Sequence, residues 1–70
     1  MRLSTRNQLT GTVTEVSVGT VMATVKVKLD GGDQVVTASI TKEAVEELGL
    51  EVGTPATVLV KSTEVMLGVE

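Results

Sequence analysis

Apolar and polar residues alternate most regularly between Val21 and Leu29. The odd-numbered positions of this stretch carry Val, Ala or Leu, and the even-numbered ones carry Met, Thr and two Lys. Because successive side chains of a strand point to opposite faces, this pattern predicts a half-buried antiparallel strand with one wet face. A Thr- and Val-rich run from Leu9 to Val16 predicts the strand before it, and Gln34 to Ile40 predicts the strand after it.

Glycine-containing segments separate these strands. Residues 17–20 predict a turn in which Gly19 adopts a positive φ, and residues 30–33, Asp-Gly-Gly-Asp, predict a hairpin turn. Gly11 lies inside the first strand and indicates a bulge or a close approach of another backbone.

A short helix is predicted after the third strand. Thr41 is placed to cap its first turn, Ala44, Val45 and Leu48 form an apolar stripe, and Gly49 ends it. A helix of two turns is not stable alone, so we expect it to lie on the sheet.

The rest of the chain predicts a fourth strand from Ala56 to Val60, a capped single turn at residues 62–65, and a short last strand from Met66 to Val69. The order is therefore β-β-β-α-β-β in a single domain spanning residues 1–70. Five strands with one short helix between strands three and four indicate a mostly β, OB-fold-like Greek-key barrel.

The composition indicates a homo-oligomer. A domain of 70 residues buries only about 60% of the surface that its unfolded chain exposes, and such domains usually need added stabilisation. The chain has no Cys and no His, which excludes disulfides, thiolate metal sites and imidazole bases. Since the mean hydropathy is nevertheless +0.30, we expect apolar surface to be buried between copies.

The charge balance argues against a nucleic-acid-binding function. Six basic and nine acidic residues give a net charge of −3, whereas nucleic-acid binding calls for a basic surface. Without Phe, Tyr or Trp there is no platform for stacking bases. No apolar run approaches the ~20 residues of a membrane span, and no signal sequence is apparent, so we expect a cytoplasmic protein. The scattered carboxylates and the absence of His and Cys argue against an enzyme.

Hydrogen-bond donors gather near both ends of the chain. Ser4, Arg6 and Asn7 stand at the start of the first strand, and Lys61 and Ser62 follow the fourth. An oxyanion in a protein without metal needs charged donors and neutral hydroxyls together. On an extended strand Ser4 and Arg6 share one face, while Thr5 and Asn7 point to the other. Thr41, at a helix start, is a further candidate.

Each of these residues also has an ordinary structural interpretation. Arg6 and Lys61 are also consistent with solvated surface charges, and Ser62 with a helix cap. Thr41 as a cap and Gly19 as a turn residue are the commoner roles of these residue types. From the residues alone the anion site is one of two open alternatives.

The order of motifs along the chain resembles the Mop family, the molbindins. The resemblance rests on Ser-x-Arg-Asn-Gln-Leu from residue 4, Gly-Thr-Val-Met-Ala from residue 19, Ala-x-Ile-Thr from residue 38, Val-Glu-Glu-Leu-Gly-Leu from residue 45 and Lys-Ser-x-Glu-Val-Met from residue 61. It covers nearly all seventy residues in the right order.

The resemblance implies a cytoplasmic OB-like protein that binds molybdate or tungstate and needs no cofactor. It also implies a homo-oligomer, a hexamer built as a trimer of dimers with strand exchange, whose oxyanion sites lie between subunits. The implied ligands are Ser4, Arg6, Thr41, Lys61 and Ser62, with Arg6 from one subunit and Lys61-Ser62 from its neighbour. A second kind of site near a symmetry axis is assigned to Val18, Gly19, Thr20 and Val21.

Two residues depart from the family pattern. Thr5 stands where many members have Ala, and Ala44 stands where some have Ser, so one hydroxyl ligand is missing here.

The function implied is storage and homeostasis of molybdate without catalysis. The alternative is an oligomeric regulatory or structural module that senses an oxyanion for a separate partner protein. An OB-type nucleic-acid module is a further rival, disfavoured by the acidic balance and the lack of aromatic residues.

Overall fold

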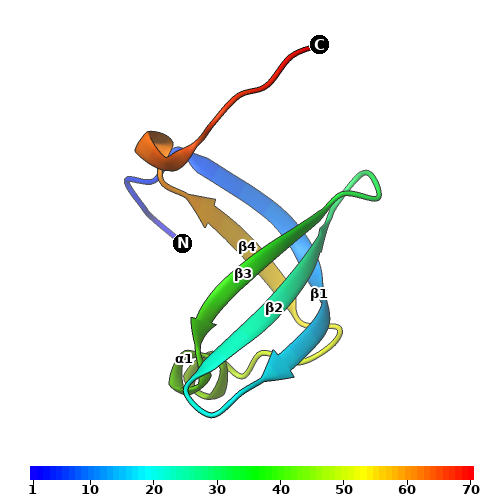
Figure 1. Ribbon diagram of the computed structural model, residues 1–70, viewed down its shortest axis with the longest axis vertical. Helices are drawn as coiled ribbons and strands as arrows, with labels where there is room; N and C mark the ends of the chain where they lie inside the picture. Colours follow the sequence, from blue (N-terminus) through cyan, green and yellow to red (C-terminus); the bar gives the residue numbers. More distant parts are fainter.

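The computed structural model describes residues 1–70 and consists of one curled antiparallel sheet with a short helix at one end (Figure 1). Its four strands lie in the order β3-β2-β1-β4. The elements are β1 (Asn7–Val18), β2 (Met22–Leu29), β3 (Val35–Thr41), α1 (Lys42–Leu48), β4 (Pro55–Val60) and the 3-10 turn η1 (Ser62–Glu64). The three expected strands before the helix, the helix itself and the fourth strand are therefore confirmed, with β1 longer at both ends than predicted.

β1 is the strand on which the sheet is built, because it pairs with both β2 and β4. The register with β2 shifts between Val13 and Glu15, so the bulge lies at Thr14 and not at Gly11. Gly11 is instead a point of close approach, since a Cβ there would clash with the backbone carbonyl oxygen of Lys28. The absence of a side chain at this position lets the backbones of β1 and β2 approach each other closely.

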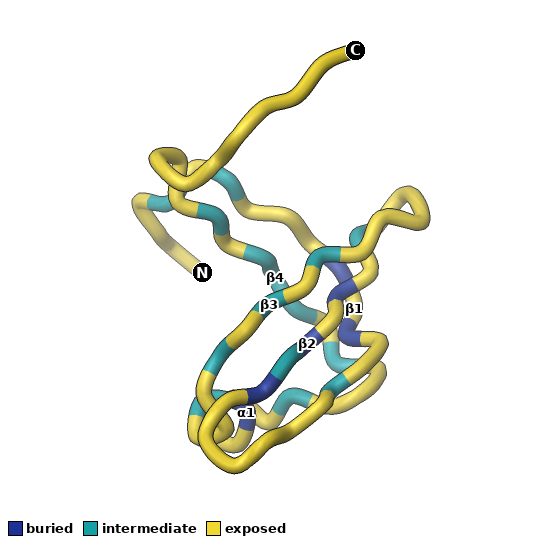
Figure 2. The backbone as a smooth tube through the Cα atoms, in the orientation of Figure 1, coloured by how far each residue is buried: buried dark blue, intermediate teal, exposed yellow.

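The core lies on the concave face of the sheet. Its buried side chains are Val13, Ala23, Val25, Val27 and Val45. The first four come from β1 and β2, as the alternation predicts, and Val45 is the one residue of α1 that reaches them. Figure 2 shows that this buried patch is confined to the middle of the sheet and the helix end. Six of 70 residues are buried, which is a small core for a chain of this length.

Both helix caps are confirmed. The Thr41 Oγ1 accepts a hydrogen bond of 3.0 Å from the Ala44 backbone N–H, and Gly49 ends the helix in the left-handed region with φ 63°. The hairpin turn at residues 30–33 is also confirmed, with Gly31 at φ 83° and the Leu29 N–H donating to Gln34 O. The expectation for Gly19 is wrong. Its φ is not positive, and its N–H closes the turn on Met22 O at 2.8 Å.

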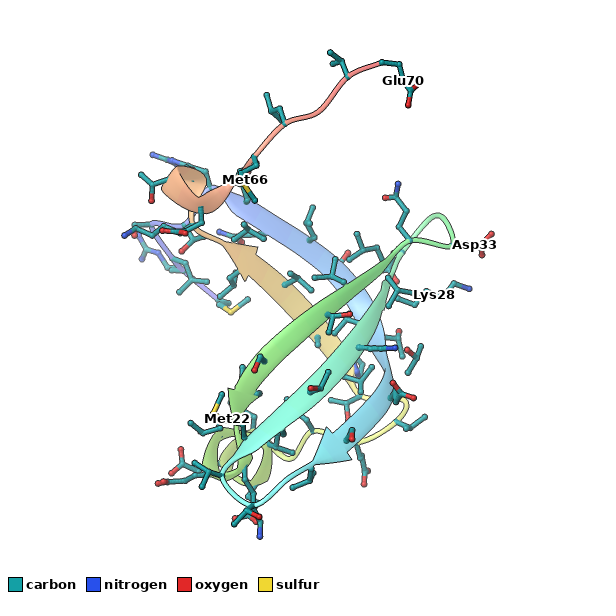
Figure 3. The ribbon with its side chains drawn as sticks, viewed as in Figure 1. Met22, Lys28, Asp33, Met66 and Glu70 are labelled. Atoms are coloured by element: carbon teal, nitrogen blue, oxygen red, sulfur yellow. The ribbon has the colours of Figure 1, made fainter.

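The predicted fifth strand is absent, so the sheet has four strands and is not a closed five-stranded barrel. Residues after η1 run away from the body of the molecule in Figures 1 and 3, where Met66 and Glu70 mark the segment. Met66, Leu67 and Val69 are more than 90% exposed. The physical reason is that this segment has no partner strand within its own chain, and β3 and β4 remain the two edges of the sheet.

No helix in the structure has both the length and the apolar character that crossing a membrane requires.

Candidate oxyanion site

The donors at the two ends of the chain meet because β1 and β4 are antiparallel neighbours. Asn7, the first residue of β1, is paired with Val60, the last residue of β4. The segment that enters β1 and the turn that leaves β4 therefore lie side by side at the end of the sheet opposite α1 (Figure 1). They enclose an open depression of about 220 Å³, lined by Ser4, Thr5, Arg6, Lys61, Ser62 and Thr63.

The charges of this depression favour an anion. Arg6 and Lys61 provide two positive charges, and all other lining residues carry hydroxyls. The two ion pairs of the chain are Lys26–Glu15 and Lys28–Asp33, so neither Arg6 nor Lys61 is neutralised by a carboxylate. Figure 3 shows Lys28 and Asp33 at the distant β2–β3 hairpin. No acidic residue lines the depression.

Two amide side chains hold its walls in place. The Asn7 Nδ2 donates to Val60 O at 3.1 Å and to the Ser62 Oγ at 3.4 Å. The Gln8 Nε2 donates to Thr5 O at 2.7 Å. The hydrogen bonds of Asn7 tie β1 to the end of β4 and to η1. The hydrogen bond of Gln8 holds the N-terminal segment against the start of β1.

Sequence reasoning missed two lining residues, Thr5 and Thr63. Thr5 was expected to point away from Ser4 and Arg6, but that expectation assumed an extended strand, and β1 begins only at Asn7. Outside a strand the alternation of faces does not apply. Thr63 was overlooked as part of a turn, although its place directly after Lys61-Ser62 was a usable signal.

Four of the expected ligands, Ser4, Arg6, Lys61 and Ser62, line one depression within a single chain. The antiparallel pairing of β1 with β4 is sufficient to unite them. The division that the resemblance implies, with Arg6 from one subunit and Lys61-Ser62 from its neighbour, stays a prediction.

Thr41 does not lie with these residues. It lies at the opposite end of the molecule, where a depression of about 400 Å³ is lined by Thr20, Val21, Thr41, Lys42, Glu43 and Glu46. Two of the four second-site candidates, Thr20 and Val21, are therefore beside Thr41. The other two, Val18 and Gly19, are in the adjoining β1–β2 turn but do not line this depression.

A third feature is an apolar groove of about 450 Å³ on the concave face. Of the 14 residues that line it, 11 are hydrophobic, among them Val25, Ile40 and Val58 from three different strands. The groove shows that the core of this chain is incompletely covered.

Comparison with known proteins identifies the family. The model of the TOBE domain matches residues 3–67. A probable molybdenum-pterin-binding protein of Haemophilus influenzae is 44% identical over 70 residues, which is 100% of both chains. The chain belongs to the Mop family of TOBE domains. The solved structures similar to this Mop chain include MopII from Clostridium pasteurianum, with a TM-score of 0.90 and 40% identity over 97% of this chain and 100% of that one.

A second solved structure is that of ModG, described as a cytoplasmic molybdate-binding protein with molybdate bound. It has a TM-score of 0.92 and 48% identity over 100% of this Mop chain and 49% of ModG. These likenesses confirm the predicted fold class, a mostly β OB-like fold with one short helix. The names of these relatives describe binding of molybdate or of molybdenum-pterin, and none describes a reaction.

Proposed function

We propose that this protein reversibly binds molybdate, and also tungstate, in the depression between the N-terminal segment and η1. The observation that carries the proposal is the pairing of two cations, Arg6 and Lys61, with hydroxyl groups in one depression that contains no carboxylate. The relatives described as binding molybdate or molybdenum-pterin support the choice of ligand.

The chemistry of the ligand fits this set of donors. Molybdate is a tetrahedral dianion, and two fixed positive charges match its charge. Arg6 offers a planar pair of N–H donors, Lys61 a point charge, and Ser4 and Ser62 offer single O–H donors for the remaining oxygen lone pairs. Selection among oxyanions of the same charge and shape then rests on cavity size and donor placement. No bond is made or broken, so the role is storage and homeostasis of the anion in the cytoplasm.

We further propose that the functional form is a homo-oligomer, a hexamer arranged as a trimer of dimers. The chain exposes 5558 Å², about a third more than the roughly 4,200 Å² expected of a folded monomer of its mass. A standard interface buries about 800 Å² on each partner, so this excess suffices for more than one. The apolar groove and the exposed residues 65–69 are the surfaces that association would cover.

Strand exchange between copies is the arrangement that we propose to cover both the apolar groove and residues 65–69. Val65, Leu67 and Val69 recur at every second position, which is the spacing of one face of a strand. In the proposed assembly this segment of one copy pairs with the open sheet edge of another and supplies the missing fifth strand.

Assembly is also the route by which Thr41 reaches the anion. Thr41 lies far from Arg6 within one chain, and its hydroxyl accepts from Ala44 N while keeping its own hydrogen to donate. In the proposal Thr41 of a neighbouring copy completes the depression, and residues 18–21 contribute to a second site near a symmetry axis. A ligand that binds only the assembled form stabilises that form by mass action.

Calorimetric titration with molybdate in low-sulfate buffer tests the binding site. Arg6→Ala is expected to weaken binding at least tenfold, roughly the 1.5–3 kcal/mol of a charge-assisted hydrogen bond. Arg2→Ala is the matched control, because Arg2 is an exposed arginine of the same segment that does not line the depression. Equal affinities for Arg6→Ala and Arg2→Ala would overturn the proposal.

A further inference from the structure

Asn7 contacts the candidate site without lining it. Its side-chain amide is half-buried at the start of β1 and reaches across to the end of β4 and into η1. Val60 O can only accept a hydrogen bond, so the atom of Asn7 that faces it at 3.1 Å is Nδ2 and not Oδ1. The amide orientation is thus fixed by a backbone carbonyl.

This orientation decides the role of the Ser62 hydroxyl. The Asn7 Nδ2 carries two hydrogens, so beside its bond to Val60 O it can also donate to the Ser62 Oγ, which lies 3.4 Å away. A hydroxyl has one hydrogen and two lone pairs. Because one lone pair accepts from Asn7, the hydroxyl hydrogen of Ser62 is left free to be donated elsewhere. A hydroxyl that accepts a hydrogen bond is also a stronger donor, since bonds in a chain polarise one another.

We propose that Asn7 is a positioning residue that holds Ser62 as a hydrogen-bond donor toward the bound oxyanion. The proposal rests on the proposed function, because it takes the anion to lie in the depression beside Ser62. Asn7 does not touch the anion; it acts through Ser62, and its hydrogen bond to Val60 O fixes its own orientation. The N–H donor of Asn7, rather than its size, is the property that matters.

Gln8 provides the internal comparison. It is also an amide, it is adjacent in the chain, and it donates to Thr5 O at 2.7 Å. It has no hydrogen bond to Ser62. A residue that merely stiffens this end of the sheet would behave as Gln8 does.

A double-mutant cycle separates the two roles. Molybdate affinity is measured by calorimetry for the wild type, Asn7→Ala, Ser62→Ala and the double variant, all as full-length protein of verified assembly. We expect Asn7→Ala to weaken binding about tenfold alone but less than about twofold in the Ser62→Ala background, because its action passes through that hydroxyl. Gln8→Ala is expected to cost the same factor in both backgrounds. Equal losses from Asn7→Ala in both backgrounds, or no loss in either, would overturn the proposal.

A ligand-free measurement tests the contact independently. In nuclear magnetic resonance spectra of anion-free protein, Ser62→Ala is expected to shift one side-chain amide proton of Asn7 upfield and to leave the Gln8 amide protons in place. Unmoved Asn7 protons would overturn the proposal whatever the ligand. Arg6→Ala distinguishes the two proposals. If Arg6→Ala weakens molybdate binding but the Asn7→Ala and Ser62→Ala effects are additive, only the positioning role of Asn7 fails. If Arg6→Ala binds molybdate as the wild type does, the proposed function fails.

Discussion

Asn7 and Val60 lie directly opposite each other across the β1–β4 pair, although they are 53 positions apart in the chain. This pairing brings the segment before β1 and the turn after β4 to the same end of the sheet. Ser4 and Arg6 thereby come to lie beside Lys61 and Ser62. The donor cluster is a consequence of strand topology, and no residue between positions 8 and 59 takes part in it.

Lys61 is expected to supply the second positive charge for the anion. Lys61→Met should weaken molybdate binding at least tenfold while leaving thermal unfolding unchanged, because the side chain is exposed and forms no ion pair. Lys26→Met is the control, since Lys26 is exposed but lies on β2 and pairs with Glu15. Calorimetry is the measurement, and similar affinities for the two variants would contradict the role of Lys61.

Thr41 tests whether a neighbouring copy completes the site. Asp is as good a helix cap as Thr, so Thr41→Asp is expected to unfold at about the wild-type temperature. Its added negative charge should nevertheless weaken molybdate binding at least tenfold if Thr41 approaches the anion from a second copy. Thr41→Asn keeps both the cap and a donor and serves as the control. Wild-type affinity in Thr41→Asp would restrict the site to residues of one chain.

The segment after η1 is expected to hold the assembly together. Replacing Leu67 and Val69 by Asp places two charges where apolar side chains, now 95% and 98% exposed, would be buried between copies. The mass measured by sedimentation equilibrium should fall to that of a smaller species. Glu70→Gln, which changes charge in the same segment without removing an apolar group, should assemble normally. An unchanged mass for the Leu67 and Val69 double variant would refute strand exchange through these residues.

Gly11 is expected to be essential for the close approach of β1 to β2. Gly11→Ala introduces a Cβ that collides with backbone atoms of Lys28, which cannot move aside as a side chain would. The cost should be about 2 kcal/mol, or roughly 10 °C in the unfolding temperature of a domain of this size. Gly32→Ala, where a Cβ meets nothing within 4 Å, is the control in a calorimetric unfolding scan. Comparable unfolding temperatures for the two variants would show that the close approach at Gly11 is not required.

Local patterns predicted the local structure well. The alternation between Val21 and Leu29 gave the correct inward face, since Ala23, Val25 and Val27 are buried. Thr41 and Gly49 were recognised as caps because their roles depend on the neighbouring few residues only.

Apart from the backbone conformation of Gly19, the errors concern relations beyond the local chain. Thr5 was assigned to the wrong face because the position where β1 begins is set by pairing with Val60 and not by β-propensity. Met66–Val69 has the composition of a strand but lacks a partner in its own chain.

Native mass spectrometry with and without molybdate, in a buffer low in sulfate, tests the central claim most directly. The proposed function predicts a hexamer that gains discrete masses of bound molybdate. A hexamer that takes up no molybdate would contradict the binding site, and a monomer would contradict the proposed assembly.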